Sequence, residues 1–292
     1  METLTSTRSI TLLLLVLLAP LCRAVSLPVD PAWNHNGPGY NGADSGQLIQ
    51  LAAGEERIPA LYHRHEGARE SGAVLILHER GEYPAWPDVV APLARGLPRH
   101  GWSTLALRLP APPPAAPDIE AGDSDGRGTW EQAVRVRIDA AIAHLEKQGA
   151  SVIILLGYGL AAPLAQAYLA QAPAAQVKGL VAVSPYLMEP LASTAQTFPA
   201  TPPLLDVFGE RDLPQVIRHI EARIRNARRA GWMKPAPFHP GDPQLQEEGL
   251  PQSGTRYRPQ LVSGAGHDYR GFEEPLLKYI LGWLRRHVME QP

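Results

Sequence analysis

Short apolar runs that alternate with amphipathic segments constrain the fold of this chain most. Ala73–Leu77 and Ser151–Leu156 consist almost entirely of apolar residues, which is typical of parallel strands that are buried on both faces. Between them, Thr129–Gln148 carries apolar residues at helical spacing. Alternating strands and helices favour βαβ units. We therefore expect an α/β fold with a mainly parallel central sheet and helices on both faces.

The same patterns place the individual elements. Strands are expected at Ile58–Tyr62, Ala73–Leu77, Ser103–Leu107, Ser151–Leu156, Lys178–Val183, Pro203–Phe208 and Tyr257–Val262. Helices are expected at Val89–Leu97, Thr129–Gln148, Ala161–Ala172, Pro214–Ala230 and Pro275–His287, with an exposed arginine-rich face at Arg223, Arg225, Arg228 and Arg229. Proline-rich loops are expected at Pro110–Gly128 and Trp232–Gly254.

The first residues have the order of an export signal. Arg8 precedes the apolar run Ile10–Leu18, and Cys22-Arg23-Ala24 places small residues at the positions that a signal peptidase reads. We expect a signal peptide at residues 1–24, an irregular segment at 25–54 and one domain at 55–292 in an exported, most simply periplasmic, protein. An uncleaved anchor is one alternative. Lipidation of Cys22 is another, although Leu21 precedes it where a small residue is usual.

The composition excludes several kinds of function. Basic residues number 27 and acidic residues 29, for a net charge of −2, so we expect no nucleic-acid partner. Cys22 is the only cysteine, which leaves the mature chain without a disulfide or a thiolate nucleophile. No spacing typical of metal ligands or of a phosphate-binding loop is present. We expect no metal or other cofactor, and no membrane span in the mature chain.

Chemistry-bearing residues follow three of the expected strands. The first strand leads into Gly157-Tyr158-Gly159-Leu160-Ala161, a turn of small residues before a helix. Asp212 follows the expected strand Pro203–Phe208. His267 follows the expected strand Tyr257–Val262, after a short glycine-rich segment. Parallel sheets carry their sites at the carboxyl ends of the strands, so we expect Asp212 and His267 within hydrogen-bond distance.

This order resembles the α/β-hydrolase superfamily, in which a nucleophile at a strand–turn–helix elbow is followed along the chain by an acid and a histidine. The resemblance places Gly159 at the nucleophile position, although glycine brings no attacking oxygen. It also places Glu79, in the segment Leu77-His78-Glu79-Arg80-Gly81, near the oxyanion hole, where a carboxylate opposes the developing charge.

The glycine-centred elbow, together with Trp86-Pro87, Leu97–Trp102 and Gly282-Trp283-Leu284, resembles an exported bacterial family catalogued as domain of unknown function 3530. That resemblance implies the hydrolase-like fold without an established activity.

Three functions remain open from the sequence. The first is a protein without serine acyl-enzyme chemistry that binds an unknown small molecule or a cell-envelope partner, with His78, Glu79, Tyr158 and Ser184 as candidate binding residues. The second is an esterase-like hydrolase in which His267 and Asp212 act on water or with a nucleophile outside the elbow, for which Ser184 is the best-placed substitute. The third is an envelope interaction protein that uses its proline-rich loops.

Overall fold

The computed structural model describes residues 46–112, 125–171, 175–186, 202–233 and 256–289, and the expected signal peptide lies outside them. An eight-stranded sheet has the order β1-β2-β4-β3-β5-β6-β7-β8. Its strands are β1 Gln47–Ala53, β2 Glu56–His63, β3 Gly72–Leu77, β4 Trp102–Leu107, β5 Ile153–Tyr158, β6 Val177–Val183, β7 Leu204–Arg211 and β8 Tyr257–Gly266. The pairs β1–β2 and β2–β4 are antiparallel and the other pairs are parallel, which confirms the predicted sheet.

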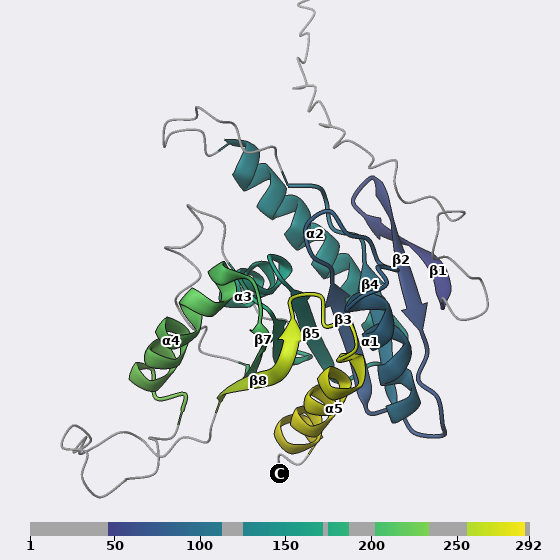
Figure 1. Cartoon of the computed structure of the whole chain (residues 1–292). Helices are drawn as coiled ribbons and strands as arrows, with labels where there is room; N and C mark the ends of the chain where they lie inside the picture. The colour runs from purple at the N-terminus through teal and green to yellow at the C-terminus, as the bar shows by residue number, and fades with distance from the viewer. Residues whose placement is uncertain (1–45, 113–124, 172–174, 187–201, 234–255, 290–292) are drawn as a thin grey trace, which may run out of the picture.

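Helices cover both faces of this sheet (Figure 1). They are α1 Val90–Gly96, α2 Asp125–Lys147, α3 Ala161–Gln171, α4 Pro214–Arg229 and α5 Glu273–Leu284. Helices α1 and α5 contribute to one hydrophobic cluster, whereas α2 and α3 contribute to another. None of the helices in the described part of the chain has the length and apolar character needed to cross a bilayer.

Two expected boundaries were wrong. Part of the segment expected to be irregular, 25–54, forms strand β1, because Ile49, Leu51 and Ala53, at alternate positions, pack into one core and β2 supplies an antiparallel partner over its whole length. Part of the expected loop Pro110–Gly128 belongs to α2, which begins at Asp125. Both segments contain glycines and prolines, which predict loops and so concealed the starts of β1 and α2 in the sequence. Strand pairing and helix packing determine these starts in the structure.

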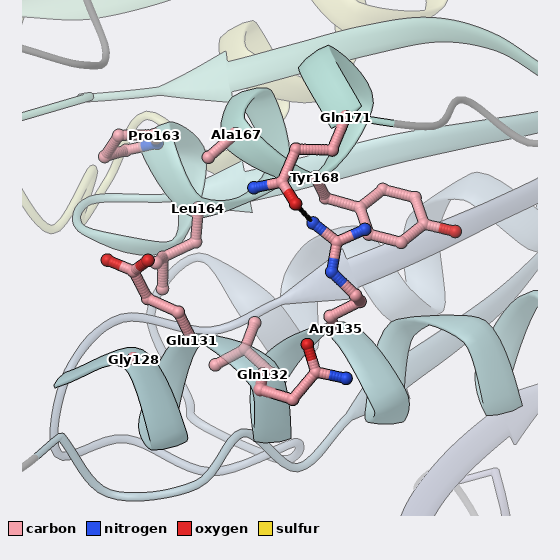
Figure 2. A pocket seen from close by; sticks show the side chains of 10 residues that line it. Gly128, Glu131, Gln132, Arg135, Pro163, Leu164, Ala167, Tyr168 and Gln171 are labelled. Carbon is pink, nitrogen blue, oxygen red and sulfur yellow. Dashed lines mark hydrogen bonds between the residues drawn. The ribbon is translucent and has the colours of Figure 1, made fainter. Parts of the chain in front are cut away.

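Helices α2 and α3 lie against each other and leave a hollow between them (Figure 2). Arg135 of α2 donates a hydrogen bond to Gln171 of α3 and lies over the ring of Tyr168. The Tyr168 hydroxyl donates to Asp139 at 2.6 Å. The polar groups at this hollow therefore connect the two helices, and the residues that line it include none of the site residues predicted from the sequence.

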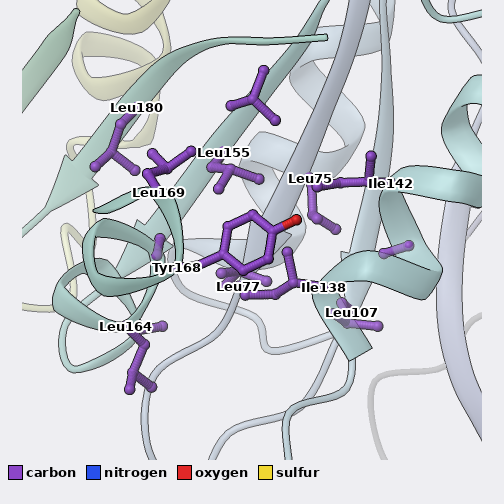
Figure 3. Close-up of a cluster of buried hydrophobic side chains, with 14 of the residues drawn as sticks. Leu75, Leu77, Leu107, Ile138, Ile142, Leu155, Leu164, Tyr168, Leu169 and Leu180 are labelled. Atoms are coloured by element: carbon purple, nitrogen blue, oxygen red, sulfur yellow. The ribbon is translucent and has the colours of Figure 1, made fainter. Parts of the chain in front are cut away.

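In the core under α2 and α3, every second side chain of the central strands is buried (Figure 3). Leu75 and Leu77 of β3 point into this cluster together with Leu155 of β5, whereas Val74 and Ile76 point to the opposite face. Successive side chains of a strand alternate between the faces of the sheet, so a continuous apolar strand fills both cores. This packing fixes the carboxyl ends of β3 and β5 side by side.

Helix α4 is attached to the sheet by a buried ion pair. Arg223 Nε donates to Asp206 Oδ2 at 2.7 Å, and the Tyr257 hydroxyl donates to the same carboxylate. The interpretation of Arg223 as part of a solvated face was therefore wrong, because Asp206 of β7 is 1% exposed and requires a cationic partner. Arg225, Arg228 and Arg229 are exposed as expected.

Candidate active site

The turn between β5 and α3 has the geometry of a sharp elbow. Gly159 has a φ of +56°, a left-handed conformation that favours glycine. Gly157 lies so close to the start of α3 that a Cβ there would be 2.5 Å from the Cα of Ala162. The small residues therefore let the helix begin directly after the strand, and they place Gly159 at the carboxyl edge of the sheet.

The carboxylate of Glu79 fills the space beside Gly159. A Cβ at Gly159 would lie 1.2 Å from Glu79 Oε2 and 2.3 Å from its Cδ. Glu79 follows β3, the strand that neighbours β5, and its Oε2 accepts a hydrogen bond from the backbone N–H of Leu160 at 3.1 Å. A side chain from the next strand thus occupies the place that a side chain of residue 159 would take.

The other oxygen of Glu79 is also held by donors. Oε1 accepts hydrogen bonds from the backbone N–H of Arg80 at 2.6 Å and from the Tyr186 hydroxyl at 2.9 Å. The Glu79 side chain is 10% exposed. Burial of a carboxylate requires such compensation, and these contacts fix one orientation of the group.

Asp212 and His267 come together as the sequence predicts. His267 Nδ1 lies 2.7 Å from Asp212 Oδ1, and His267 Nε2 lies 3.7 Å from Glu79 Oε2. The Asp212 side chain is fully buried, while that of His267 is 19% exposed. The imidazole therefore stands between two carboxylates, one from the β7–α4 connection and one from the end of β3.

These carboxylates control the protonation of His267. Burial alone lowers the pKa of His267, but the hydrogen bond to Asp212 and the carboxylate of Glu79 outweigh burial and raise this pKa to about 9. Burial opposes the ionisation of Asp212 in the same way. Hydrogen bonds from His267, Ser184 and the backbone N–H groups of Gly209 and Leu213 outweigh it and lower the pKa of Asp212. An ionised Asp212 beside a protonated His267 is the resulting state at neutral pH.

The Ser184 hydroxyl hydrogen-bonds to Asp212, and among the hydrogen bonds of the described residues none joins this hydroxyl to His267. Its hydroxyl donates to Asp212 Oδ2 and lies 2.9 Å from the Tyr269 hydroxyl. Ser184 is fully buried and has a φ of +47°, a conformation that is uncommon for a residue with a Cβ. This geometry gives Ser184 a part in holding the acid and does not place it as a nucleophile beside the imidazole.

The remaining predicted residues surround the imidazole or support its neighbours. The ring of Tyr158 lies 5.2 Å from that of His267, and its hydroxyl donates to the His267 carbonyl at 3.0 Å. Both ring nitrogens of His78 bond to backbone groups, those of Glu79 and Leu109. Burial lowers the pKa of His78 to about 4, so this residue is a neutral connection between the ends of β3 and β4.

Sequence reasoning missed three residues of the site. Tyr186 follows β6, Tyr269 follows β8 and Glu82 follows β3. The signal that could have identified these residues is their position beyond the carboxyl ends of strands, where parallel sheets carry their sites. Glu82 accepts a hydrogen bond from the backbone N–H of Glu79, and burial, together with the charges of Glu79 and Asp88, raises the pKa of Glu82 to about 8. Within the described residues, no group of three or more metal-binding side chains could hold a metal ion.

Comparisons with known proteins identify the relatives of this chain. The family described as "Protein of unknown function (DUF3530)" matches residues 43–125 and 115–232. No curated protein matches in sequence.

Solved structures with a similar fold include Est1E from Butyrivibrio proteoclasticus, with a TM-score of 0.60, 11% identity and coverage of 83% of this chain and 99% of that one. A dienelactone hydrolase from Anabaena variabilis has a TM-score of 0.58, 19% identity and coverage of 83% and 99%. A Pyrococcus furiosus esterase has a TM-score of 0.59, 13% identity and coverage of 89% and 98%. At these identities the structures establish the fold that the chains share.

Proposed function

The chain belongs to the DUF3530 family and has the α/β-hydrolase fold, and we propose that it is an exported protein that binds a small molecule beside Glu79, His267 and Asp212 without serine acyl-enzyme chemistry. One observation carries the proposal. Glu79 Oε2 lies 1.2 Å from the place of a Cβ at Gly159, so a carboxylate stands where the nucleophile of such a fold would stand.

The charge of Glu79 supports the same conclusion. An acyl-transfer site stabilises the developing oxyanion with backbone N–H donors. Here the N–H of Leu160, which follows the elbow residue, already donates to Glu79 Oε2. An oxyanion at this position would lose that donor and meet a carboxylate, which disfavours attack on an ester carbonyl at residue 159.

A second candidate function is hydrolysis with a nucleophile outside the elbow. The observation that favours it is the pair of His267 and Asp212, 2.7 Å apart, with the second imidazole nitrogen directed at Glu79. A histidine oriented by a carboxylate is the base of many hydrolytic sites. Several structures with this fold are named as hydrolases or esterases, and this analogy of fold supports hydrolysis as the second candidate.

Export is proposed on the N-terminal sequence. Arg8, the run Ile10–Leu18 and Cys22-Arg23-Ala24 support cleavage after Ala24 and a periplasmic location, where a cell-envelope partner is a further candidate. Sequencing the N-terminus of protein recovered from the periplasm should give Val25. Recovery of intact material beginning at Met1 would contradict this proposal.

A labelling experiment tests the proposed function. A fluorophosphonate probe should leave the purified protein unmodified, and 4-nitrophenyl butyrate should be hydrolysed no faster by the wild type than by His267→Ala. A serine hydrolase of the same fold serves as the positive control, and circular dichroism confirms that both proteins are folded. Labelling of a serine together with ester hydrolysis that His267→Ala abolishes would overturn the proposal.

A further inference from the structure

Exposed cations gather at the amino ends of β6, β7 and β8. Among the described residues, the end of α4, the start of β8 and the segment after α5 (226–233, 256–260 and 285–288) hold six arginines and no acidic residue. The start of β6 adds a lysine. These seven exposed residues are called the basic face: Lys178, Arg228, Arg229, Arg256, Arg258, Arg285 and Arg286.

Contacts between the segments bring the basic face together. The backbone N–H of Arg256 donates to the carbonyl of Trp232 at 2.8 Å, which joins the start of β8 to the end of α4. The N–H of Leu204 donates to the Arg256 carbonyl at 2.6 Å, which joins β7 to the same point. The last turn of α5 lies over the start of β6, because a Cβ at Gly179 would be 2.8 Å from the Trp283 ring. Figure 1 accordingly shows the ends of α4 and α5 on the side of the molecule where β8 begins.

The charges of two of these segments act on the same place. Burial lowers the pKa of His287, and the charges of Arg258 and Arg286 lower it further. Arg258 belongs to β8 and Arg286 follows α5. The positive potentials of β8 and of the segment after α5 therefore overlap at His287.

The carboxyl ends of the strands carry the opposite charge. The stretches 78–88, 209–213 and 266–274, at the ends of β3, β7 and β8, hold eight acidic residues and three arginines. Glu79 and Asp212 of the candidate site are among these acidic residues. The molecule is therefore polarised along its strands, with the site at the acidic edge and the basic face at the other.

We propose that the basic face docks on membranes that contain anionic phospholipids, with the candidate site directed away from the bilayer. Guanidinium groups form paired hydrogen bonds with phosphate oxygens. Each lysine or arginine near an anionic bilayer strengthens binding about fivefold. The acidic edge favours the same orientation, because an anionic surface repels it.

The N-terminal sequence favours a membrane over a nucleic acid, the other polyanion that such a face fits. Arg8, the run Ile10–Leu18 and Cys22-Arg23-Ala24 support export, which brings the chain to the cell envelope and away from nucleic acids. The inference names the chemistry of the envelope partner, and in this respect it rests on the proposed export.

Sedimentation with vesicles tests the docking. The full chain is mixed with vesicles of phosphatidylcholine alone, or of equal parts phosphatidylcholine and phosphatidylglycerol. It should sediment only with the second kind. Raising the salt from about 0.1 M to 1 M shortens the Debye length from about 10 Å to 3 Å, so it should release the protein. Equal binding to both kinds of vesicle, or binding that survives the higher salt, would overturn the proposal.

Charge reversal locates the docking face. Arg228→Glu with Arg258→Glu should weaken binding to the anionic vesicles on the order of 100-fold, because it removes two attractive charges and adds two repulsive ones. Arg57→Glu with Arg211→Glu is the matched control, since it makes the same change in net charge at exposed positions of the acidic edge. The control should bind like the wild type. An equal loss in both folded double variants would contradict docking through the basic face.

A fluorescent label tests the orientation without any charge reversal in the basic face. Cys22 is the only cysteine, so a Cys22→Ser chain can carry one environment-sensitive dye at Ala230→Cys, beside Arg229, or at Glu55→Cys, in the turn between β1 and β2. Both positions are exposed. On anionic vesicles the emission should rise for the dye at 230 and stay unchanged for the dye at 55. A rise at 55 alone would refute the proposed orientation.

Failure of the docking is distinguishable from failure of the proposed export. If the protein ignores anionic vesicles while its N-terminus begins at Val25, the docking is wrong and the export stands. If the N-terminus remains at Met1, the export is wrong and the vesicle experiments alone decide the docking. Tighter binding of duplex DNA than of anionic vesicles at equal salt would assign the basic face to a nucleic acid and overturn the proposal.

Discussion

Replacement of Gly159 by Ala should force the Glu79 carboxylate out of its place. The new Cβ would lie 1.2 Å from Oε2 and 2.3 Å from Cδ of Glu79, so the two side chains cannot coexist. When Glu79 moves, the buried N–H of Leu160 loses its acceptor. The alanine must also adopt a φ of +56°.

These two effects set the expected loss in the free energy of unfolding. An unsatisfied buried N–H costs about 1–3 kcal/mol, and the left-handed conformation costs an alanine about 1–2 kcal/mol. Gly159→Ala should therefore lower the free energy of unfolding by about 2–5 kcal/mol. In a Glu79→Ala background the N–H has already lost its acceptor, so the same substitution should cost only the conformational part, about 1–2 kcal/mol.

Denaturant unfolding of the four proteins in this cycle measures the coupling energy. We expect the glycine substitution to be less destabilising by about 1–3 kcal/mol when Glu79 is absent. Gly54→Ala is the matched control, because Gly54 has a φ of +63° and open space around its missing Cβ. Additive effects of the two substitutions, with Gly159→Ala no worse than Gly54→Ala, would refute the arrangement at the elbow.

Three further predictions concern charge and the missing hydroxyl. NMR titration should give His267 a pKa of about 9 in the wild type and a lower pKa in Glu79→Gln. Because this pKa is raised in the folded protein, protonated His267 stabilises the fold; the contribution is complete below pH 6.5 and is lost as pH rises through about 9. Asp206→Ala should lower the free energy of unfolding by about 3–5 kcal/mol, since it leaves Arg223 without its carboxylate partner, whereas the exposed Glu221→Ala should change it by less than about 0.5 kcal/mol. Gly159→Ser should produce no esterase activity with 4-nitrophenyl butyrate, because Glu79 occupies the space of the new side chain; a strongly active variant would contradict this.

The sequence was most informative where both faces of a strand are buried. Ala73–Leu77 is a continuous apolar run within β3, and Ser151–Leu156, which is apolar from Val152 onward, overlaps β5. A run of this kind has few alternatives to a central strand, because every residue must find an apolar environment. The carboxyl ends of such strands then bring Asp212 and His267 to one edge.

Contacts between side chains of different strands were beyond the sequence. Glu79 was expected near the oxyanion hole, but its contact with Leu160 depends on the pairing of β3 with β5 and on the rotamer of Glu79. The bond between Ser184 and Asp212 likewise depends on a backbone conformation that is rare for serine. Such contacts arise from tertiary geometry, for which no local pattern exists.

Gly159 and Glu79 form one structural feature. The left-handed φ explains why glycine is tolerated at the elbow, but an elbow in this fold can also hold a residue with a Cβ. The overlap with the Glu79 carboxylate supplies the stronger reason, because it excludes every side chain at position 159 while Glu79 remains in place. A serine elbow would therefore require two changes in this chain, a hydroxyl at 159 and a different residue at 79. The two positions should be substituted together, because either change alone leaves the site with a collision or with an unpaired Leu160 N–H.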